Sequence, residues 1–147
     1  MIHLIICGHG QIADGLLSGL KLLAGEVNAC HSLNFPEGMS SESLAQSLRN
    51  IVAACQDKPI LIFTDIMGGT PFRQAALIAN ERPDCEIISG MNLPMLIEAV
   101  MERDEAENVA DFAENLVQNT RDSIARYSAL LQSRIKNNPV VIDDDGI

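Results

Sequence analysis

The stretch "PILIFTDIMGGTPF", residues 59–72, decides the fold. Its first part, residues 59–64, is short and uniformly apolar, which is typical of a central strand covered by helices on both faces. A carboxylate and a pair of glycines follow, and a helix is then expected over residues 71–80, with Thr70 as its N-cap and a proline in its first turn. The stretch therefore predicts a buried strand whose carboxyl end carries polar side chains.

The same alternation of strand and helix recurs on both sides of this stretch. Short apolar runs predict strands over residues 2–7, 27–35, 59–64 and 85–89. Segments with apolar residues at helical spacing follow them, over residues 11–24, 40–55, 71–80 and 94–103. A strand followed by a helix, repeated in this way, predicts a three-layer α/β domain with a mainly parallel sheet.

Composition narrows the class of protein. The chain has 147 residues, which is a common size for one domain, and 47% of them are hydrophobic. Ten basic residues against twenty acidic ones give a formal charge of −10, which disfavours binding to nucleic acid or to anionic lipid. No apolar run is long enough for a membrane span. The four cysteines form no C-x-x-C pair, so we expect reduced thiols in a cytoplasmic protein and no metal site.

The last third of the chain allows two interpretations. Apolar residues at helical spacing make one helix over residues 109–134 the plain prediction. Polar and apolar residues also alternate over residues 123–131, as in a strand. We place the end of the folded domain at residue 135 and expect an acidic C-terminal tail over residues 136–147.

Three loops that follow predicted strands carry the polar chemistry. They are Gly8-His9-Gly10, residues 64–72, and "GMNLPML" at residues 90–96. Ligands of parallel α/β sheets bind at the carboxyl ends of the strands, where helix N-termini point toward them. We therefore expect the three loops to meet at one edge of the sheet and to bring His9 close to Asp65.

His9 itself allows three interpretations. Gly8-x-Gly10-x-x-Ala13 matches a dinucleotide-binding turn, but the second predicted strand ends in Asn34-Phe35, without the acidic residue that binds ribose. A histidine at a strand end can also serve packing alone. The third interpretation is a nucleophile, with glycines that leave room for a bulky donor.

The nucleophile interpretation assigns a role to each group. Asp65 accepts a hydrogen bond from one ring nitrogen of His9, which fixes the tautomer and leaves the other nitrogen free to attack phosphorus. Backbone N–H groups at the starts of the first and third predicted helices stabilise the anion. Such chemistry depends on positioning and charge stabilisation, so we expect no cofactor.

These loops also resemble a known family. "GHGQIADGLL", "FTDIMGGTPFRQAA" and "SGMNLPMLIEAV" are similar, in order and spacing over residues 1–104, to the signature loops of the mannose-type enzyme IIA domain of the phosphoenolpyruvate-dependent sugar phosphotransferase system. The resemblance implies a cytoplasmic phosphocarrier. It implies that His9 accepts a phosphoryl group on Nε2 from the histidine phosphocarrier protein and donates it to a separate cognate enzyme IIB, while Asp65 orients the ring through Nδ1.

The resemblance extends to the surrounding residues and to assembly. Residues expected to bind the phosphoryl group are Gly10, Gly68, Gly69 and Thr70. Residues expected to contact partner proteins are Met67, Arg73, Met91 and Asn92. Family members form homodimers in which a late strand lies antiparallel at the edge of the partner's sheet. By this likeness the helix ends near Thr120 and a strand follows over residues 122–131.

The sequence allows one alternative function for the chain and one alternative role for His31. A non-catalytic regulatory module of α/β fold that binds a nucleotide or a sugar would use the same loops. His31 follows Cys30 within a predicted strand, and core packing explains it better than metal binding does. The transported sugar is a family-level expectation only, a hexose or an amino sugar, because specificity resides in membrane components.

Overall fold

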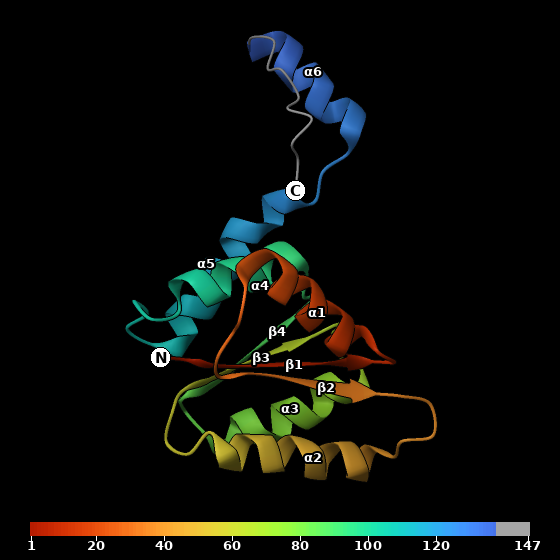
Figure 1. Ribbon diagram of the computed structural model, residues 1–147, viewed down its shortest axis with the longest axis vertical. Coiled ribbons are helices and arrows are strands. Elements are labelled where there is room, and N and C mark those ends of the chain that lie inside the picture. The colour runs from red at the N-terminus through yellow and green to blue at the C-terminus, as the bar shows by residue number, and fades with distance from the viewer. Residues whose placement is uncertain (138–147) are drawn as a thin grey trace.

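The computed structural model describes residues 1–137 (Figure 1). Its strands are β1 (His3–His9), β2 (Cys30–Phe35), β3 (Ile60–Thr64) and β4 (Cys85–Ser89). They form one parallel sheet in the order β2-β1-β3-β4. Its helices are α1 (Ile12–Ala24), α2 (Ser41–Ala54), α3 (Thr70–Glu81), α4 (Leu93–Glu102), α5 (Val109–Thr120) and α6 (Tyr127–Asn137). The predicted strands and the first four predicted helices are confirmed, with ends displaced by a few residues.

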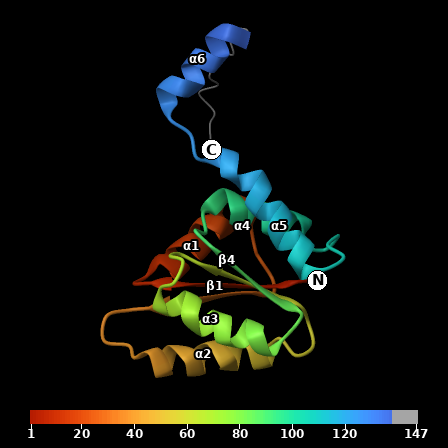
Figure 2. The same cartoon turned by 180° about the vertical axis from the view of Figure 1, so that it is seen from behind.

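The sheet is the middle of three layers. Helices α1, α4 and α5 cover one face, and α2 and α3 cover the other (Figures 1 and 2). Successive side chains of a strand point to opposite faces. In β3, Leu61 and Phe63 join the core beneath α1, α4 and α5, whereas Ile60 and Ile62 join the core against α2 and α3. The strand is uniformly apolar because it serves both cores.

The order of the strands creates a position for a ligand. From β1 the chain passes through α1 to β2 on one side, and from β3 it passes through α3 to β4 on the other side. The two loops diverge above the carboxyl ends of β1 and β3, which leaves a crevice at this point in sheets of this type. His9 ends β1 and Asp65 follows β3, so the topology brings them together.

The opposite end of the sheet is held by a buried arginine that the sequence pattern does not single out. Arg103 is 5% exposed and lies directly after α4. Its guanidinium donates to the carbonyl oxygens of Ile2, Asn28 and Ala29 at 3.3, 2.5 and 3.1 Å. Hydrogen bonds from a charged donor are stronger than neutral ones. Arg103 therefore fixes the amino ends of β1 and β2 beside each other.

The C-terminal segment departs from both predictions. Helix α5 ends at Thr120 as expected, but a 3₁₀ turn (Arg121–Ser123) and then α6 follow. The single helix over residues 109–134 is interrupted after Thr120. There the Ser123 hydroxyl donates to Thr120 O, a side-chain bond to the backbone that competes with continuation of the helix.

The strand expected over residues 122–131 is also absent from the described residues. A strand needs a neighbouring sheet edge for its backbone groups, and α6 projects away from the sheet (Figures 1 and 2). A helix satisfies those groups within the segment itself. Most of the expected acidic tail, residues 138–147, lies outside the described residues. None of the helices in the described part has the length and apolar character needed to cross a membrane.

Candidate functional site

His9 and Asp65 form a hydrogen-bonded pair at the carboxyl edge of the sheet. The Nδ1 atom of His9 lies 2.9 Å from Oδ2 of Asp65, and the backbone N–H of His9 donates to the same oxygen at 2.9 Å. The imidazole is 43% exposed, whereas the carboxylate is 11% exposed. The ring is thus anchored through Nδ1 and open to solvent on its remaining surface.

Asp65 is held in the charged form. Burial by itself raises the pKa of the Asp65 carboxyl, but hydrogen bonds from the His9 backbone, the His9 ring and the Ile66 N–H lower that pKa below its ordinary value overall. A carboxylate only accepts hydrogen bonds, so the short contact places a proton on Nδ1 of the ring. In the neutral imidazole the lone pair is then on Nε2, which makes Nε2 the nucleophilic atom.

Two close contacts restrict the ring further. Phe35, which pairs with His9 across the β1–β2 ladder, meets the imidazole edge to face, with ring centroids 5.7 Å apart. On the other side the chain at Gly69 lies so near that an added Cβ would be 2.9 Å from Cε1 and 3.6 Å from Nε2 of His9. At Gly8 an added Cβ would lie 3.2 Å from Cγ of Asp65, so glycine lets the two loops approach.

The start of α3 presents backbone donors beside Nε2. Gly69, not Thr70, is the N-cap, because the Gly69 carbonyl accepts the first intrahelical bond, from Arg73 N–H at 2.9 Å. Thr70 is the first helical residue, and its expected capping bond is absent among the described residues. The N–H groups of Thr70 and Phe72 are in the first turn and have no intrahelical acceptor. They can bind an anion attached to Nε2.

One of the donors expected before α1 is occupied. The Gly10 N–H donates to Phe35 O at 2.8 Å, so it is not available to a phosphoryl group. The Asp14 N–H donates to Oδ1 of Asn34, and the Asp14 carboxylate accepts hydrogen bonds from Ser32 and Asn34. The negative charge of Asp14 in this first turn also disfavours the dinucleotide interpretation, because it would repel a pyrophosphate at this helix start.

The expected partner-contacting residues divide into two groups. Met67 is 76% exposed, and Arg73 is exposed as well. Ile66, which the sequence interpretation missed, adds a second apolar side chain with 59% exposure. Met91 is only 9% exposed and belongs to the core, so the expectation that it contacts partners is wrong. Asn92 caps α4, since its Oδ1 accepts a hydrogen bond from Met95 N–H at 3.0 Å.

The substitution Gly69→Ala is expected to displace the imidazole of His9 and to slow a reaction at its Nε2 atom by about tenfold or more, because small displacements of reacting groups have large effects on rate. The new methyl group would push against Cε1 of the ring. Gly69 has φ of −69°, so alanine brings no backbone strain, and we expect the free energy of unfolding to fall by only about 1 kcal/mol or less, because alanine is a poorer N-cap than glycine. Gly15→Ala, where an added Cβ meets nothing within 4 Å, is the control. Equal rates for the two variants would contradict the steric role of Gly69.

Comparisons with known proteins agree with this geometry. The family of PTS system fructose IIA components, EIIA-man, matches residues 3–128. The sorbose-specific EIIA component of Klebsiella pneumoniae is 35% identical over 100 residues, which cover 68% of this chain and 73% of that protein. The mannose-specific EIIAB component of Escherichia coli (strain K12) is 30% identical over 129 residues, which cover 87% of this chain and 40% of that longer protein.

A solved structure is also similar. The crystal structure of phosphotransferase system component EIIA from Streptococcus agalactiae superimposes with a TM-score of 0.82 at 37% sequence identity. The superposition covers 88% of this chain and 99% of that one. The chain therefore belongs to the EIIA-man family, the IIA components that carry phosphoryl groups in sugar transport by the phosphotransferase system.

Proposed function

We propose that Nε2 of His9 accepts a phosphoryl group from the histidine phosphocarrier protein and passes it to a cognate enzyme IIB in the cytoplasm. The observation that carries the proposal is the His9–Asp65 pair, in which Nδ1 is bonded at 2.9 Å while Nε2 lies beside the start of α3. Family membership supports a phosphocarrier role in general. The identity of the two partners is part of the proposal.

The geometry suggests how the first transfer proceeds. The lone pair of Nε2 attacks the phosphorus of the donor phosphohistidine, and the donor N–P bond breaks with its electron pair returning to the donor ring. The Nδ1 proton stays in place, so the phosphorylated His9 ring carries positive charge. The Asp65 carboxylate stabilises that charge, and the N–H groups of Thr70 and Phe72 stabilise the phosphoryl oxygens.

The second transfer reverses these roles. A nucleophile on enzyme IIB attacks the same phosphorus, and the bond from Nε2 breaks. A ring that still bears its Nδ1 proton leaves as a neutral imidazole, which is a better leaving group than an imidazolide anion. Asp65 therefore assists both steps by keeping the proton on Nδ1.

Exposed side chains next to the ring favour protein partners over a small substrate. Ile66 and Met67 project from the loop after β3 with exposures of 59% and 76%. Methionine adapts to different apolar surfaces, which suits a site that must receive two partners in turn. Arg73 lies one turn into α3 and can meet an acidic group of either partner.

The decisive experiment is incubation with phosphoenolpyruvate, enzyme I and the histidine phosphocarrier protein. We expect a label that is labile in acid and stable in base, located on His9 by fragmentation mass spectrometry. His3→Gln and His31→Gln are expected to label normally. A label on either of those histidines would overturn the proposal. Failure to label at all would favour the non-catalytic regulatory module.

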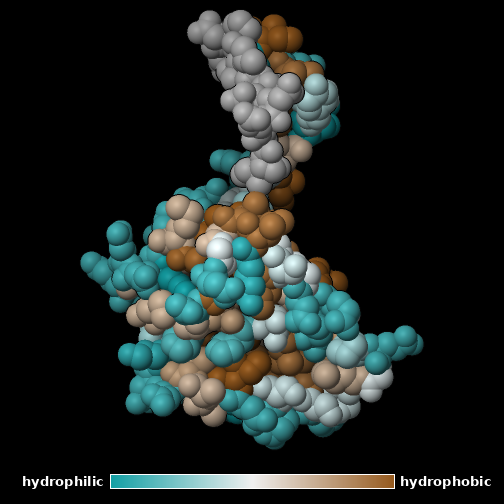
Figure 3. All heavy atoms as spheres, in the orientation of Figure 1, coloured by the Kyte–Doolittle hydropathy of each residue, from teal (hydrophilic) through white to brown (hydrophobic). Residues whose placement is uncertain are grey.

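We further propose that two copies of the chain associate through the C-terminal segment. Large apolar side chains there are unusually exposed: Ile124 83%, Tyr127 67%, Leu130 46% and Ile135 81%. Figure 3 shows apolar surface both on this segment and on the adjoining part of the body. Clusters of exposed apolar side chains are typical of association surfaces.

Sedimentation equilibrium tests the association. We expect a mass about twice that of the 15.9 kDa chain, because a second copy can cover the exposed residues. The double substitution Ile124→Asp and Ile135→Asp is expected to give the monomer mass. Leu22→Asp, on α1 at 85% exposure, is the control and should leave the dimer intact. A wild-type chain that sediments as a monomer would refute this part of the proposal.

A further inference from the structure

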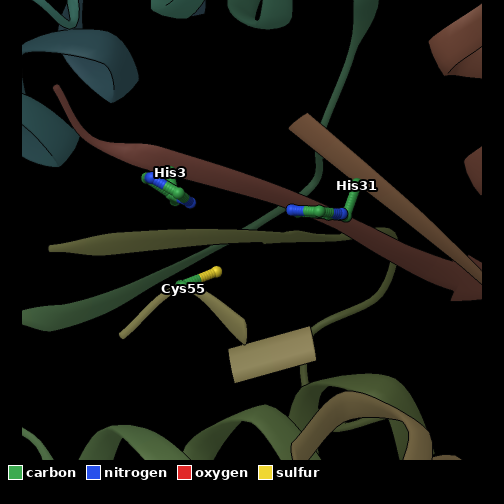
Figure 4. A group of neighbouring side chains, drawn as sticks. All are labelled: His3, His31 and Cys55. Atoms are coloured by element: carbon green, nitrogen blue, oxygen red, sulfur yellow. The ribbon is translucent and has the colours of Figure 1, made fainter. Parts of the chain in front are cut away.

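Three side chains from separate elements converge on the face of the sheet that α2 and α3 cover. His3 is the first residue of β1, His31 is in β2, and Cys55 follows the last turn of α2 (Figure 4). One ligand atom of each residue, a ring nitrogen or the thiol sulfur, lies within 4.8 Å of the other two. Cys55 is 1% exposed and belongs to the core on this face.

His3 also carries an unpartnered polar atom, which indicates that a partner belongs beside its ring. Nδ1 of His3 is buried and has no hydrogen-bond partner among the described residues. Buried nitrogen atoms of native proteins nearly always form a hydrogen bond to protein or to water, so a buried nitrogen without one needs an explanation. A metal ion that accepts the nitrogen lone pair supplies one.

The donor set selects the kind of ion. Imidazole nitrogen and thiolate sulfur suit Zn²⁺, whereas Mg²⁺ and Ca²⁺ require oxygen ligands. Zinc binds nitrogen at about 2.0–2.1 Å and sulfur at about 2.3 Å, so ligand atoms around a tetrahedral ion lie about 3.5 Å apart. The three ligand atoms of the cluster, all within 4.8 Å of one another, are close to this separation.

We propose that His3, His31 and Cys55 bind one Zn²⁺ ion, with a water molecule as the fourth ligand. On binding, the thiol proton of Cys55 passes to solvent and sulfur coordinates as the thiolate. The ion would connect β1, β2 and the end of α2. His3 and His9 are at opposite ends of β1, which separates them by about 20 Å. The site is therefore independent of the phosphoryl acceptor.

The sequence interpretation excluded a metal site for an understandable reason. Metal sites are recognised in sequence by short spacings such as C-x-x-C, and these three ligands are distant along the chain. Cys30 and His31 are adjacent in the sequence but cannot bind the same ion, because adjacent strand residues point to opposite faces of the sheet. Cys30 packs with the core under α1, α4 and α5, on the far face from Cys55.

Titration of the full-length protein with Zn²⁺, and with Co²⁺ as a spectroscopic probe, tests the site. We expect one ion per chain, a thiolate-to-cobalt charge-transfer band and a higher melting temperature with Zn²⁺ but not with Mg²⁺. Cys55→Ala and His31→Gln are each expected to weaken binding by about tenfold or more and to remove or shift the band. Both variants should retain wild-type circular dichroism and phosphoryl transfer.

Two control variants make the outcome unambiguous. Cys30→Ala changes the thiol next to His31 in sequence but on the opposite face, and it should bind Zn²⁺ as the wild type does. His9→Gln should also bind normally, because the ion would not occupy the phosphoryl site. The proposal is overturned if Zn²⁺ binding depends on His9 or Cys30, if it survives Cys55→Ala unchanged, or if no stoichiometric binding occurs.

Discussion

His9→Gln is expected to abolish phosphoryl acceptance, with a rate lowered by about 10³-fold or more, as for removal of other catalytic nucleophiles. The glutamine amide can still donate a hydrogen bond to Asp65, but its nitrogen lone pair is delocalised into the carbonyl and cannot attack phosphorus. The measurement is the initial rate of label transfer from the phosphorylated histidine phosphocarrier protein.

The loss must be separated from unfolding and from general effects of losing an imidazole. His9 is exposed at the sheet edge, so we expect the free energy of unfolding to change by less than about 0.5 kcal/mol. His31→Gln removes an imidazole from the neighbouring strand and is expected to transfer at the wild-type rate. Residual transfer within tenfold of wild type in His9→Gln would exclude His9 as the acceptor.

The fold was predictable because its signals are local and repeated. The central strand is a short apolar run, and three of the helices have a start signal, which is Ser40 before α2 and a proline in the first turn of α3 and of α4. The oxygen of Ser40 accepts the Ser43 N–H at 3.1 Å, as an N-cap should. The proximity of His9 and Asp65 followed from topology alone, since the carboxyl ends of adjacent parallel strands must meet.

What could not be predicted depends on contacts between distant segments. No local pattern shows that Asn34 would bond the Asp14 amide at the start of α1, or that Phe35 would occupy Gly10 N–H. The exposure of Met67 and the burial of Met91 could not be predicted from the sequence either, because both residues follow a strand in loops of similar composition. Their difference arises from which loop folds back over the core.

The C-terminal segment shows a different limit. Periodicity favoured a helix over residues 109–134, and family likeness favoured a strand over residues 122–131. The structure has a break after Thr120 and a second helix from Tyr127. Both conformations are accessible to a short amphipathic segment, and tertiary contacts choose between them. A sequence cannot report contacts with a second chain.

Asp65→Asn is expected to slow phosphoryl transfer by about tenfold to a hundredfold. In the wild type, Oδ1 of Asp65 accepts a hydrogen bond from the Ile66 N–H at 2.9 Å. Asparagine can keep its oxygen toward His9, but its NH₂ group then faces the Ile66 N–H, and two donors cannot bond to each other. Rotating the amide instead presents two donors to Nδ1 and to the His9 N–H. Either orientation also removes the negative charge that stabilises the phosphorylated ring, and hydrogen bonds to charged groups contribute about 1.5–3 kcal/mol.

A positioning role for Asp65 has its own signatures. Nitrogen NMR should show the wild-type ring with its proton on Nδ1, and a larger share of the Nε2–H tautomer in Asp65→Asn. Asp14→Asn, which removes an equal charge from the first turn of α1, should leave tautomer and rate unchanged. A rate loss without a change in tautomer or in ring protonation would assign Asp65 to partner binding instead.

The difference in stability between the wild type and Asp65→Asn is expected to depend on pH in a defined direction. The pKa of Asp65 is lowered from its ordinary value of 3.8 by its bonds to His9, so the folded state binds that proton less readily than the unfolded state does. The resulting stabilisation is complete above the unfolded pKa and is lost as pH falls through the folded pKa. The difference in unfolding free energy between wild type and Asp65→Asn should therefore shrink below about pH 4. A difference that stays constant from neutral to acidic pH would show that the carboxylate is not held by His9 in solution.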